Sequence, residues 1–343
     1  MIDALALLGV LLLPFLLGSA LLRRLGVRFG DDGLAWLGWC WPLGALTTAL
    51  LTGLWMATGA EPRAGLMYLP PVGLWLALWF WPRPDATIGS AMRTSLVRRL
   101  AVALVALVAV LPLTRHALEE YGRPIHGDDD ASIWTFKAVI LAEHGRFDAA
   151  LAEKLDERKT GAHHLDYPLL NPLLQVFILG ATDERVAGAL RWPSIFWALS
   201  LLALAGSAFL RAGGLLAGSL LWLAFAWAPA FQARVLGTKS DVITALGLLA
   251  LIDAIGRLRA TRSMALVAAM AAILVWSKNE GLMLACVVLI ALGLRQGRSL
   301  LAGVWRPASL WLLLPLGVAL GQWAFNRYYG LENDLLTGGA GRD

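Results

Sequence analysis

Three adjacent carboxylates, Asp128, Asp129 and Asp130, are the first candidates for chemistry in this sequence. Carboxylates crowded together repel one another, which favours a neighbouring cation or a raised pKa on one of them. Such a group can act as a general base toward a hydroxyl or an amine, or the oxygens can hold a divalent ion such as Mg²⁺ or Mn²⁺. The alternative is structural, because acids before a helix stabilise its free N–H groups and its dipole.

A second group of candidates follows in the same hydrophilic stretch, where His163, His164, Asp166 and Tyr167 precede a proline. These side chains could position a donor substrate. Adjacent histidines project in different directions, so they suit a metal less well than a helical pair four residues apart. A solvated loop before a proline-started helix is the structural alternative.

Further charged candidates stand at the ends of apolar segments. Lys278 and Glu280 lie between two such segments with almost no linker, and charges at membrane depth are costly and normally paired or functional. Lys278 can bind a phosphate as a point charge, with Glu280 as its partner; a structural pair at a tight turn is the alternative. Lys239, Asp241 and Arg191 stand at comparable ends, either as ligands or as helix caps and interfacial anchors.

The elements that must position these residues are apolar helices. The chain has 343 residues, of which 58% are hydrophobic and 15% charged, with a mean hydropathy of +0.66. Soluble domains are about 45–50% apolar and about 25% charged, so the composition excludes an ordinary soluble protein. Since a spanning helix needs about 20 largely apolar residues, we predict an all-α, polytopic transmembrane bundle of about ten spans. The predicted spans are 3–22, 34–56, 65–81, 98–114, 186–210, 214–230, 241–256, 264–277, 281–294 and 308–325.

The basic residues predict the orientation of this bundle. Fourteen arginines lie in or beside one set of connecting loops, whereas six Lys and Arg residues lie in the opposite short loops and the C-terminus. Because positive charge favours the cytoplasmic side, both termini and the hydrophilic stretch 115–168 are predicted to face outward. That stretch holds eleven of the 24 acids and all five histidines. The net charge of +5 does not indicate a nucleic-acid partner, because the basic residues mostly flank spans.

Two short helices are predicted beside the hydrophilic stretch. In residues 130–144, Ile133, Phe136 and Ile140 recur at helical spacing. Residues 169–179 form a second short apolar run. Both are too short to span, so we predict interfacial helices lying at the outer membrane surface.

Four motifs, taken in order, resemble the GT-C superfamily of integral-membrane glycosyltransferases. The resemblance covers residues 96–325 and is closest to the bacterial branch of the dolichyl-phosphate-mannose-protein mannosyltransferases and aminoarabinose transferases. The motifs are Asp128-Asp129-Asp130 with Ile133-Trp134 and Lys137-Ala138, then Asp166-Tyr167-Pro168-Leu169, Arg191-Trp192-Pro193 and Lys278-Asn279-Glu280-Gly281.

The resemblance implies a GT-C-like fold and an inverting transfer of a sugar from a polyprenyl-phosphate-linked donor. The acceptor would be a glycolipid, a polysaccharide or a protein at the periplasmic face of a bacterial inner membrane. The family's catalytic acid lies five residues before the tryptophan, which implies Asp129, with Asp128 and Asp130 as alternatives. The implied substrate-binding residues are Lys137, His163, His164, Asp166, Tyr167, Arg191, Lys239, Asp241, Lys278 and Glu280.

Two regions lie outside the family-like core. Residues 1–95 add about three spans before it, and residues 326–343 form a short outward tail after it. A transporter or flippase of lipid-linked sugars is the rival hypothesis, and a non-catalytic subunit that binds the same lipid is a third. Transporters keep ionisable groups near the midplane, whereas the polar groups here gather in one outer loop and at outer span ends, which favours surface chemistry.

Overall fold

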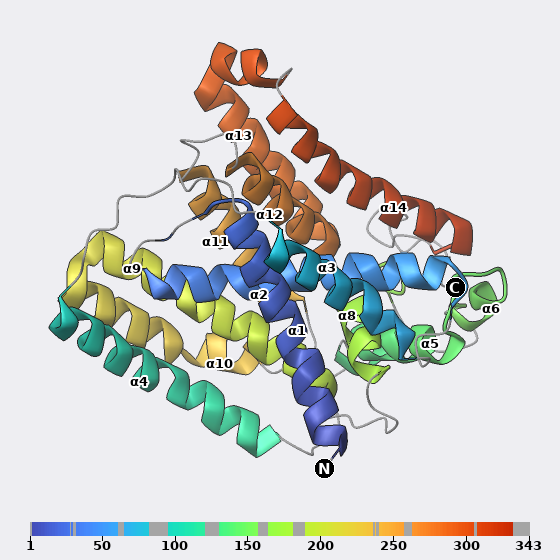
Figure 1. Cartoon of the computed structure of the whole chain (residues 1–343), viewed down its shortest axis with the longest axis horizontal. Coiled ribbons are helices and arrows are strands. Elements are labelled where there is room, and N and C mark those ends of the chain that lie inside the picture. Colours follow the sequence, from blue (N-terminus) through green and yellow to red (C-terminus); the bar gives the residue numbers. More distant parts are fainter. Residues whose placement is uncertain are drawn as a thin grey trace, which may run out of the picture.

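The computed structural model describes residues 2–27, 29, 32–60, 65–81, 95–120, 130–156, 164–180, 189–235, 237, 240–256, 263–304 and 307–331. Within these residues the regular elements are helices and no strand occurs, which confirms the predicted all-α class (Figure 1). The first helices are α1 (Ile2–Arg24), α2 (Gly33–Ala57), α3 (Leu69–Phe80), α4 (Leu96–Glu120), α5 (Phe136–His144), α6 (Leu151–Lys154) and α8 (Leu170–Leu179). The later helices are α9 (Trp192–Ala226), α10 (Pro229–Val235), α11 (Asp241–Gly256), α12 (Ser263–Ser277), α13 (Asn279–Val304) and α14 (Leu313–Tyr329).

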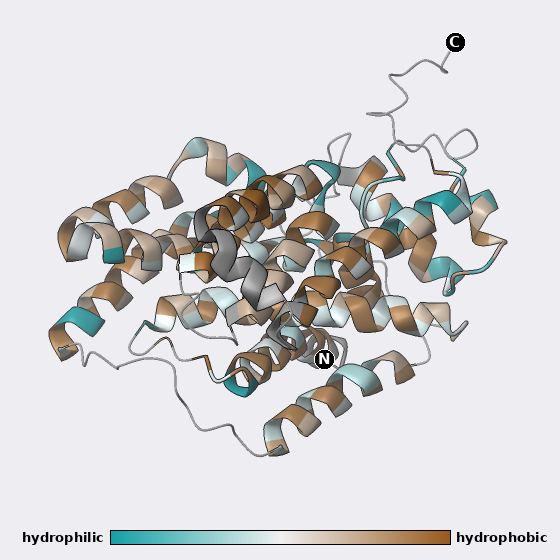
Figure 2. Ribbon diagram, turned by 90° about the horizontal axis from the view of Figure 1, so that it is seen from above, coloured by the Kyte–Doolittle hydropathy of each residue, from teal (hydrophilic) through white to brown (hydrophobic). Residues whose placement is uncertain are grey.

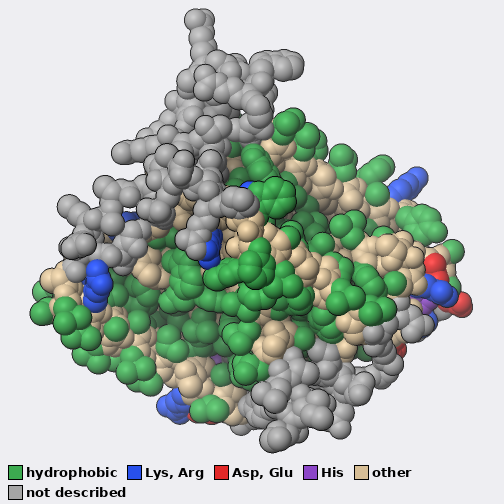
Figure 3. All heavy atoms as spheres, in the orientation of Figure 1, with side chains coloured by type: hydrophobic (Ala, Val, Ile, Leu, Met, Phe, Trp, Pro, Cys, Tyr) green, Lys and Arg blue, Asp and Glu red, His purple; other side chains and the backbone are tan. Residues whose placement is uncertain are grey.

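Four helical segments are long and apolar enough to cross a membrane, which marks the chain as a membrane protein. They are Leu7–Arg24, Gly33–Ala57, Leu96–Glu119 and Ala189–Ala226. Shorter apolar helices add Leu66–Phe80, Leu170–Leu179, Met264–Ser277 and Asn279–Leu294. Hydrophobic residues predominate along the helices in Figure 2 and dominate the face drawn in Figure 3. The count of about ten spans stays a prediction.

α9 is a helical hairpin rather than one long rod. Gly214 interrupts it with φ 69° and ψ −167°, in the left-handed region that glycine adopts without steric cost. The limbs fold back on each other, because the rings of Phe209 and Phe225 lie 6.2 Å apart and a Cβ atom on Gly206 would lie 2.4 Å from the Trp222 ring. The two limbs correspond to the predicted spans 186–210 and 214–230.

The N-terminal helices α1 and α2 cross at backbone contact. A Cβ atom on Gly18 would lie 1.7 Å from the carbonyl oxygen of Cys40, and one on Gly44 would lie 1.6 Å from that of Pro14. Small residues at such crossings let backbones approach closely inside a membrane. α2 also packs against α8, α9 and α12, so this N-terminal helix belongs to the same bundle as the later helices.

α12 lies at the centre of the bundle, where it packs against α2, α11, α13 and α14 (Figure 1). Every residue from Ala265 to Trp276 is buried. Its 15 residues rise only about 22 Å, which is short of the roughly 30 Å of hydrocarbon in a bilayer. A helix of this length is enclosed by its neighbours instead of by lipid.

The two short helices predicted beside the hydrophilic stretch are present but enclosed. The run 130–144 divides into a π-helical turn at Asp130–Thr135 and the helix α5. The run 169–179 forms α8, in which every residue from Leu170 to Ile178 is buried. α8 therefore has no apolar face left for a membrane surface, and the expectation of an exposed interfacial helix is wrong for this element. α5 packs against α8, and its residues Ile140 and Leu141 are buried.

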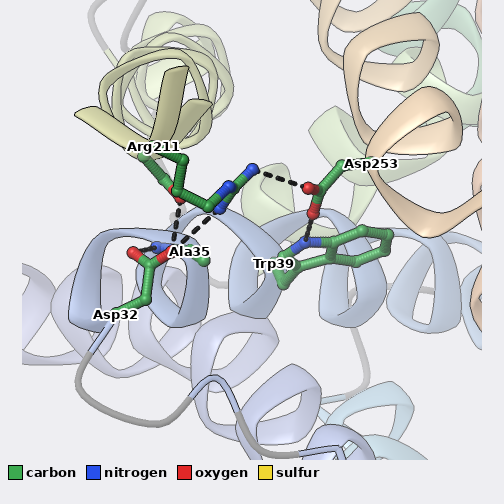
Figure 4. Close-up of polar contacts among 6 residues, drawn as sticks. Asp32, Ala35, Trp39, Arg211 and Asp253 are labelled. Carbon is green, nitrogen blue, oxygen red and sulfur yellow. Dashed lines mark hydrogen bonds and ion pairs between the residues drawn. The ribbon is translucent and has the colours of Figure 1, made fainter. Parts of the chain in front are cut away.

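Arg211, beside the kink of α9, joins three helices through two carboxylates (Figure 4). Its Nη1 lies 2.9 Å from Asp32 Oδ2, and its Nη2 lies 2.8 Å from Asp253 Oδ1. Asp253 also accepts a hydrogen bond of 3.1 Å from the indole of Trp39, and Asp32 caps α2 by accepting the Ala35 N–H at 3.0 Å. Charge-assisted bonds of this kind are geometrically specific, so they fix α2, α9 and α11 relative to one another.

We predict that Gly18→Ala separates α1 from α2. The added methyl would overlap the backbone of Cys40, and overpacking of this kind typically costs about 1–3 kcal/mol. The thermal midpoint of the purified protein in detergent should fall clearly. Gly9→Ala is the matched control, because nothing lies within 4 Å of a Cβ atom at that position of α1. Equal midpoints for the two variants would contradict the close crossing.

Candidate functional site

A pocket of about 140 Å³ brings together residues that are far apart in the sequence. Its walls come from the π-helical turn, from the segment that begins at His164, from the N-terminus of α11 and from the link between α12 and α13. Four of the substrate-binding residues predicted from the sequence line this one cavity: His164, Tyr167, Asp241 and Lys278. The lining residues are Ile133, Trp134, His164, Tyr167, Ser240, Asp241 and Lys278.

Lys278 is the cationic residue of the pocket and is held by acids. Its Nζ lies 3.1 Å from Asp241 Oδ1 and 3.7 Å from Glu280 Oε1. Partial burial acts to lower the pKa of Lys278, but the charge and hydrogen bond of Asp241, together with Glu280, raise that pKa above its usual value. The ammonium is therefore charged at neutral pH. Arg234 lies 3.6 Å from the other carboxylate oxygen of Asp241, so this acid bridges two cations.

Aromatic side chains also line the pocket. The ring centroids of Trp134 and Tyr167 lie 5.4 Å apart, and those of His164 and Tyr167 lie 5.2 Å apart. The surface that the pocket exposes is mostly polar, so these rings shape its wall while polar groups make most of its contact surface. Lys278 can donate hydrogen bonds to phosphate or hydroxyl oxygens, and Asp241 can accept them from hydroxyl groups.

His164 adopts a strained backbone conformation at the edge of the pocket. Its φ of 57° is the one positive value among the described residues other than glycine, and its carbonyl accepts a hydrogen bond of 3.1 Å from the Tyr167 N–H. The left-handed region costs a residue with a side chain roughly 1–2 kcal/mol. Such strain persists only where the surroundings fix the conformation, and several side chains do so here.

Lys137 holds this segment from behind the pocket. It is fully buried on α5, and its ammonium donates hydrogen bonds to the backbone carbonyls of Leu165 and Tyr167. The Nζ also lies 5.5 Å from the centroid of the Phe325 ring, a cation–π contact with α14. Lys137 does not line the pocket, so its geometry supports a positioning role more directly than contact with a substrate.

Asp166 is likewise buried beside the pocket and outside its lining. Its carboxylate accepts a hydrogen bond of 2.9 Å from Asn279, the residue after Lys278. Its backbone carbonyl accepts bonds from two side chains of α14, at 2.7 Å from Asn326 and 3.5 Å from Gln322. The segment 164–169 is thus bonded to α5, to the start of α13 and to α14.

The other predicted site residues lie apart from the pocket or outside the described residues. Arg191 is buried in the turn Ala189–Arg191 before α9 and does not line the cavity. Glu280 contributes through its ion pair with Lys278. The backbone of Asp130 begins the π-helical turn, but its side chain is not described. Asp128, Asp129, His163 and Lys239 lie outside the described residues.

Some residues of the site escaped the sequence analysis. Ser240 lines the pocket and is buried, directly before the first residue of α11; a serine at that position is a common helix cap. Gln322 and Asn326 bond to the segment 166–169. The sequence signal for them is a pair of amides four residues apart, on one face near the C-terminal end of α14. Within the described residues, no three His, Cys, Asp or Glu side chains gather as a metal site.

Comparisons with protein-family models, with curated proteins and with solved structures find no match to this chain.

We predict that His164→Gly is at least as stable as the wild type, whereas His164→Ala is not. Glycine adopts a φ of 57° without steric cost, so it should exceed alanine by about 1 kcal/mol at this position. Thermal unfolding in detergent measures the difference. Gly145→Ala is the companion variant, because Gly145 has a φ of 82° and its replacement should also be destabilising. Equal stability for glycine and alanine at position 164 would contradict the strain.

Proposed function

We propose that this protein is a membrane glycosyltransferase of the GT-C type that takes a sugar from a polyprenyl-phosphate donor. The observation that carries the proposal is the pocket, in which Trp134, Tyr167, Asp241 and Lys278 meet. Three of the four motifs that resemble the family each contribute a side chain to this one cavity. A chance resemblance of separate short motifs would not require them to be neighbours in space.

The chemistry of the pocket suits the head of such a donor. The Lys278 ammonium carries a positive charge for the phosphate, and a charged hydrogen bond of this kind is about twice as strong as a neutral one. The aromatic walls suit the faces of a sugar ring, and Asp241 can accept hydrogen bonds from hydroxyl groups. The volume of about 140 Å³ favours a head of small size over a long oligosaccharide.

The proposed base is Asp129, which stands five residues before Trp134 in the sequence. A carboxylate there would take the proton from the acceptor hydroxyl or amine while the acceptor attacks the sugar carbon that bears the phosphate. That attack forms the new glycosidic bond, breaks the bond to the phosphate oxygen and inverts the configuration. Lys278 would stabilise the charge on the departing phosphate.

The proposed setting is a bacterial inner membrane, with the pocket facing the periplasm and the donor lipid supplied by the bilayer. The arginine asymmetry supports this orientation. The acceptor is then a glycolipid, a polysaccharide or a protein on that side. A flippase, or a subunit that only binds the lipid, would also hold the donor at Lys278. Transfer itself distinguishes the enzyme from both.

We predict that Lys278→Ala weakens binding of a polyprenyl-phosphate probe at least tenfold, because the phosphate loses its charged partner. Lys278→Arg should retain part of the affinity. Titration of the purified protein in nanodiscs gives the dissociation constants, and thermal unfolding verifies that the variants fold. Lys154→Ala, at an exposed lysine of α6, is the control and should bind normally. Unchanged affinity in Lys278→Ala would mean that the lysine only bridges Asp241 and Glu280.

We predict that Asp129→Asn nearly abolishes transfer while leaving thermal stability unchanged. Asparagine keeps the size and the capping oxygen of aspartate but cannot take a proton at neutral pH. Transfer should fall by a factor on the order of 10²–10⁴, the usual contribution of general-base catalysis. Asp128→Asn and Asp130→Asn are the matched controls and should lose less. If all three variants stay active, the acids only cap the helix; if a chelator stops the wild type, they hold a divalent ion.

A further inference from the structure

Gln322 of α14 makes four hydrogen bonds that join three parts of the chain behind the pocket. Its Oε1 accepts the backbone N–H of Leu169 at 3.0 Å and the indole N–H of Trp276 at 3.2 Å. Its Nε2 donates to Asn326 Oδ1 at 2.8 Å and to the carbonyl of Asp166 at 3.5 Å. A side-chain amide has two acceptor lone pairs and two donor hydrogens, so the bonding capacity of Gln322 is filled.

The partners fix which way this amide faces. Leu169 N–H and the Trp276 indole are donors only, so the oxygen of Gln322 must point toward them and the nitrogen toward Asp166 and Asn326. The side chain is 9% exposed, in an interior where an unsatisfied donor or acceptor is costly. Because the site is buried, water has little access to replace the hydrogen bonds that the Gln322 amide makes to its four partners.

We propose that Gln322 is a positioning residue that holds the pocket wall formed by His164 and Tyr167. The inference rests on the proposed function of the pocket and adds a role for α14, which contributes no lining residue. Asp166 and Leu169 flank Tyr167 on either side in the sequence, so bonds to both restrict the backbone that carries its ring. The strained φ of His164 requires support of this kind.

The same segment is also bonded from α5 by Lys137, which limits the damage when Gln322 is replaced. The fold should survive, while the part of the segment nearest Leu169 becomes free to move. The expected consequence is a less well-formed wall and weaker donor binding. Loss of folded protein would instead lower the apparent kcat and leave KM unchanged.

The test replaces Gln322 with methionine, which has similar volume and lacks the amide. Hydrogen exchange of the full chain in nanodiscs, followed for peptides that cover residues 165–172, should show the Leu169 amide exchanging about tenfold faster. The donor KM should rise about tenfold, with kcat within about threefold of the wild type. Gln175→Met is the matched control, because the buried amide of Gln175 has no hydrogen-bond partner among the described residues; exchange, KM and kcat should all stay unchanged.

A double variant tests whether Gln322 acts through the pocket wall. Tyr167→Ala removes the ring that Gln322 is proposed to position, so Tyr167→Ala with Gln322→Met should lose little more than the worse single variant, because effects that share one route are not additive. Unchanged exchange at Leu169, additive losses, or an equal loss in Gln175→Met would overturn the proposal. If exchange rises as expected but the wild type transfers no sugar, the positional bond stands and the glycosyltransferase assignment fails.

Discussion

The backbone of residues 164–169 must be hydrogen-bonded inside an apolar bundle, and this requirement organises the site. Buried carbonyl and N–H groups without partners are costly, and this segment belongs to no regular element before α8. Lys137 satisfies the carbonyls of Leu165 and Tyr167, while α14 satisfies the Leu169 N–H and the Asp166 carbonyl. Charged and amide side chains therefore lie in the interior, where they bond to backbone groups that have no helical partner.

The helix α11 connects the pocket to the rest of the bundle. α11 begins at Asp241 in the pocket and carries Asp253, which pairs with Arg211, near its other end. Its 16 residues span about 24 Å, so one rigid helix joins the two polar groups. Arg211 of α9 also bonds to Asp32, the cap residue of α2. The position of Asp241 in the pocket therefore depends on how α11 packs against α9 and bonds to α2.

The features that could be predicted from the sequence are those that a local pattern of residues determines. The apolar runs gave the helices, and the tight links gave the hairpin of α9 and the position of Lys278 between α12 and α13. Residues 130–144 were predicted as helical from their spacing and 169–179 from a short apolar run, but the burial of both depends on packing partners that no local pattern specifies. The resemblance implies Lys137 as a substrate-binding residue, which stays a prediction; its bonds to the Leu165 and Tyr167 carbonyls depend on tertiary packing that no local pattern specifies. The role of Gln322 depends on Leu169 and Trp276, which are distant in sequence.

Under the proposed function, the acids beside Lys278 leave this lysine able to bind a ligand. An ammonium has three donors, and within the described residues one of them bonds to Asp241; Glu280, at 3.7 Å, is too distant for a hydrogen bond. The acids keep the lysine charged and restrict its rotamers, so part of the ordering cost of binding is met in advance. They also reduce the net positive charge of the site, which weakens attraction for small free anions. The proposed site would then select its ligand by the shape of the cavity around Tyr167, whose backbone is held by the bonds to Asp166 and Leu169.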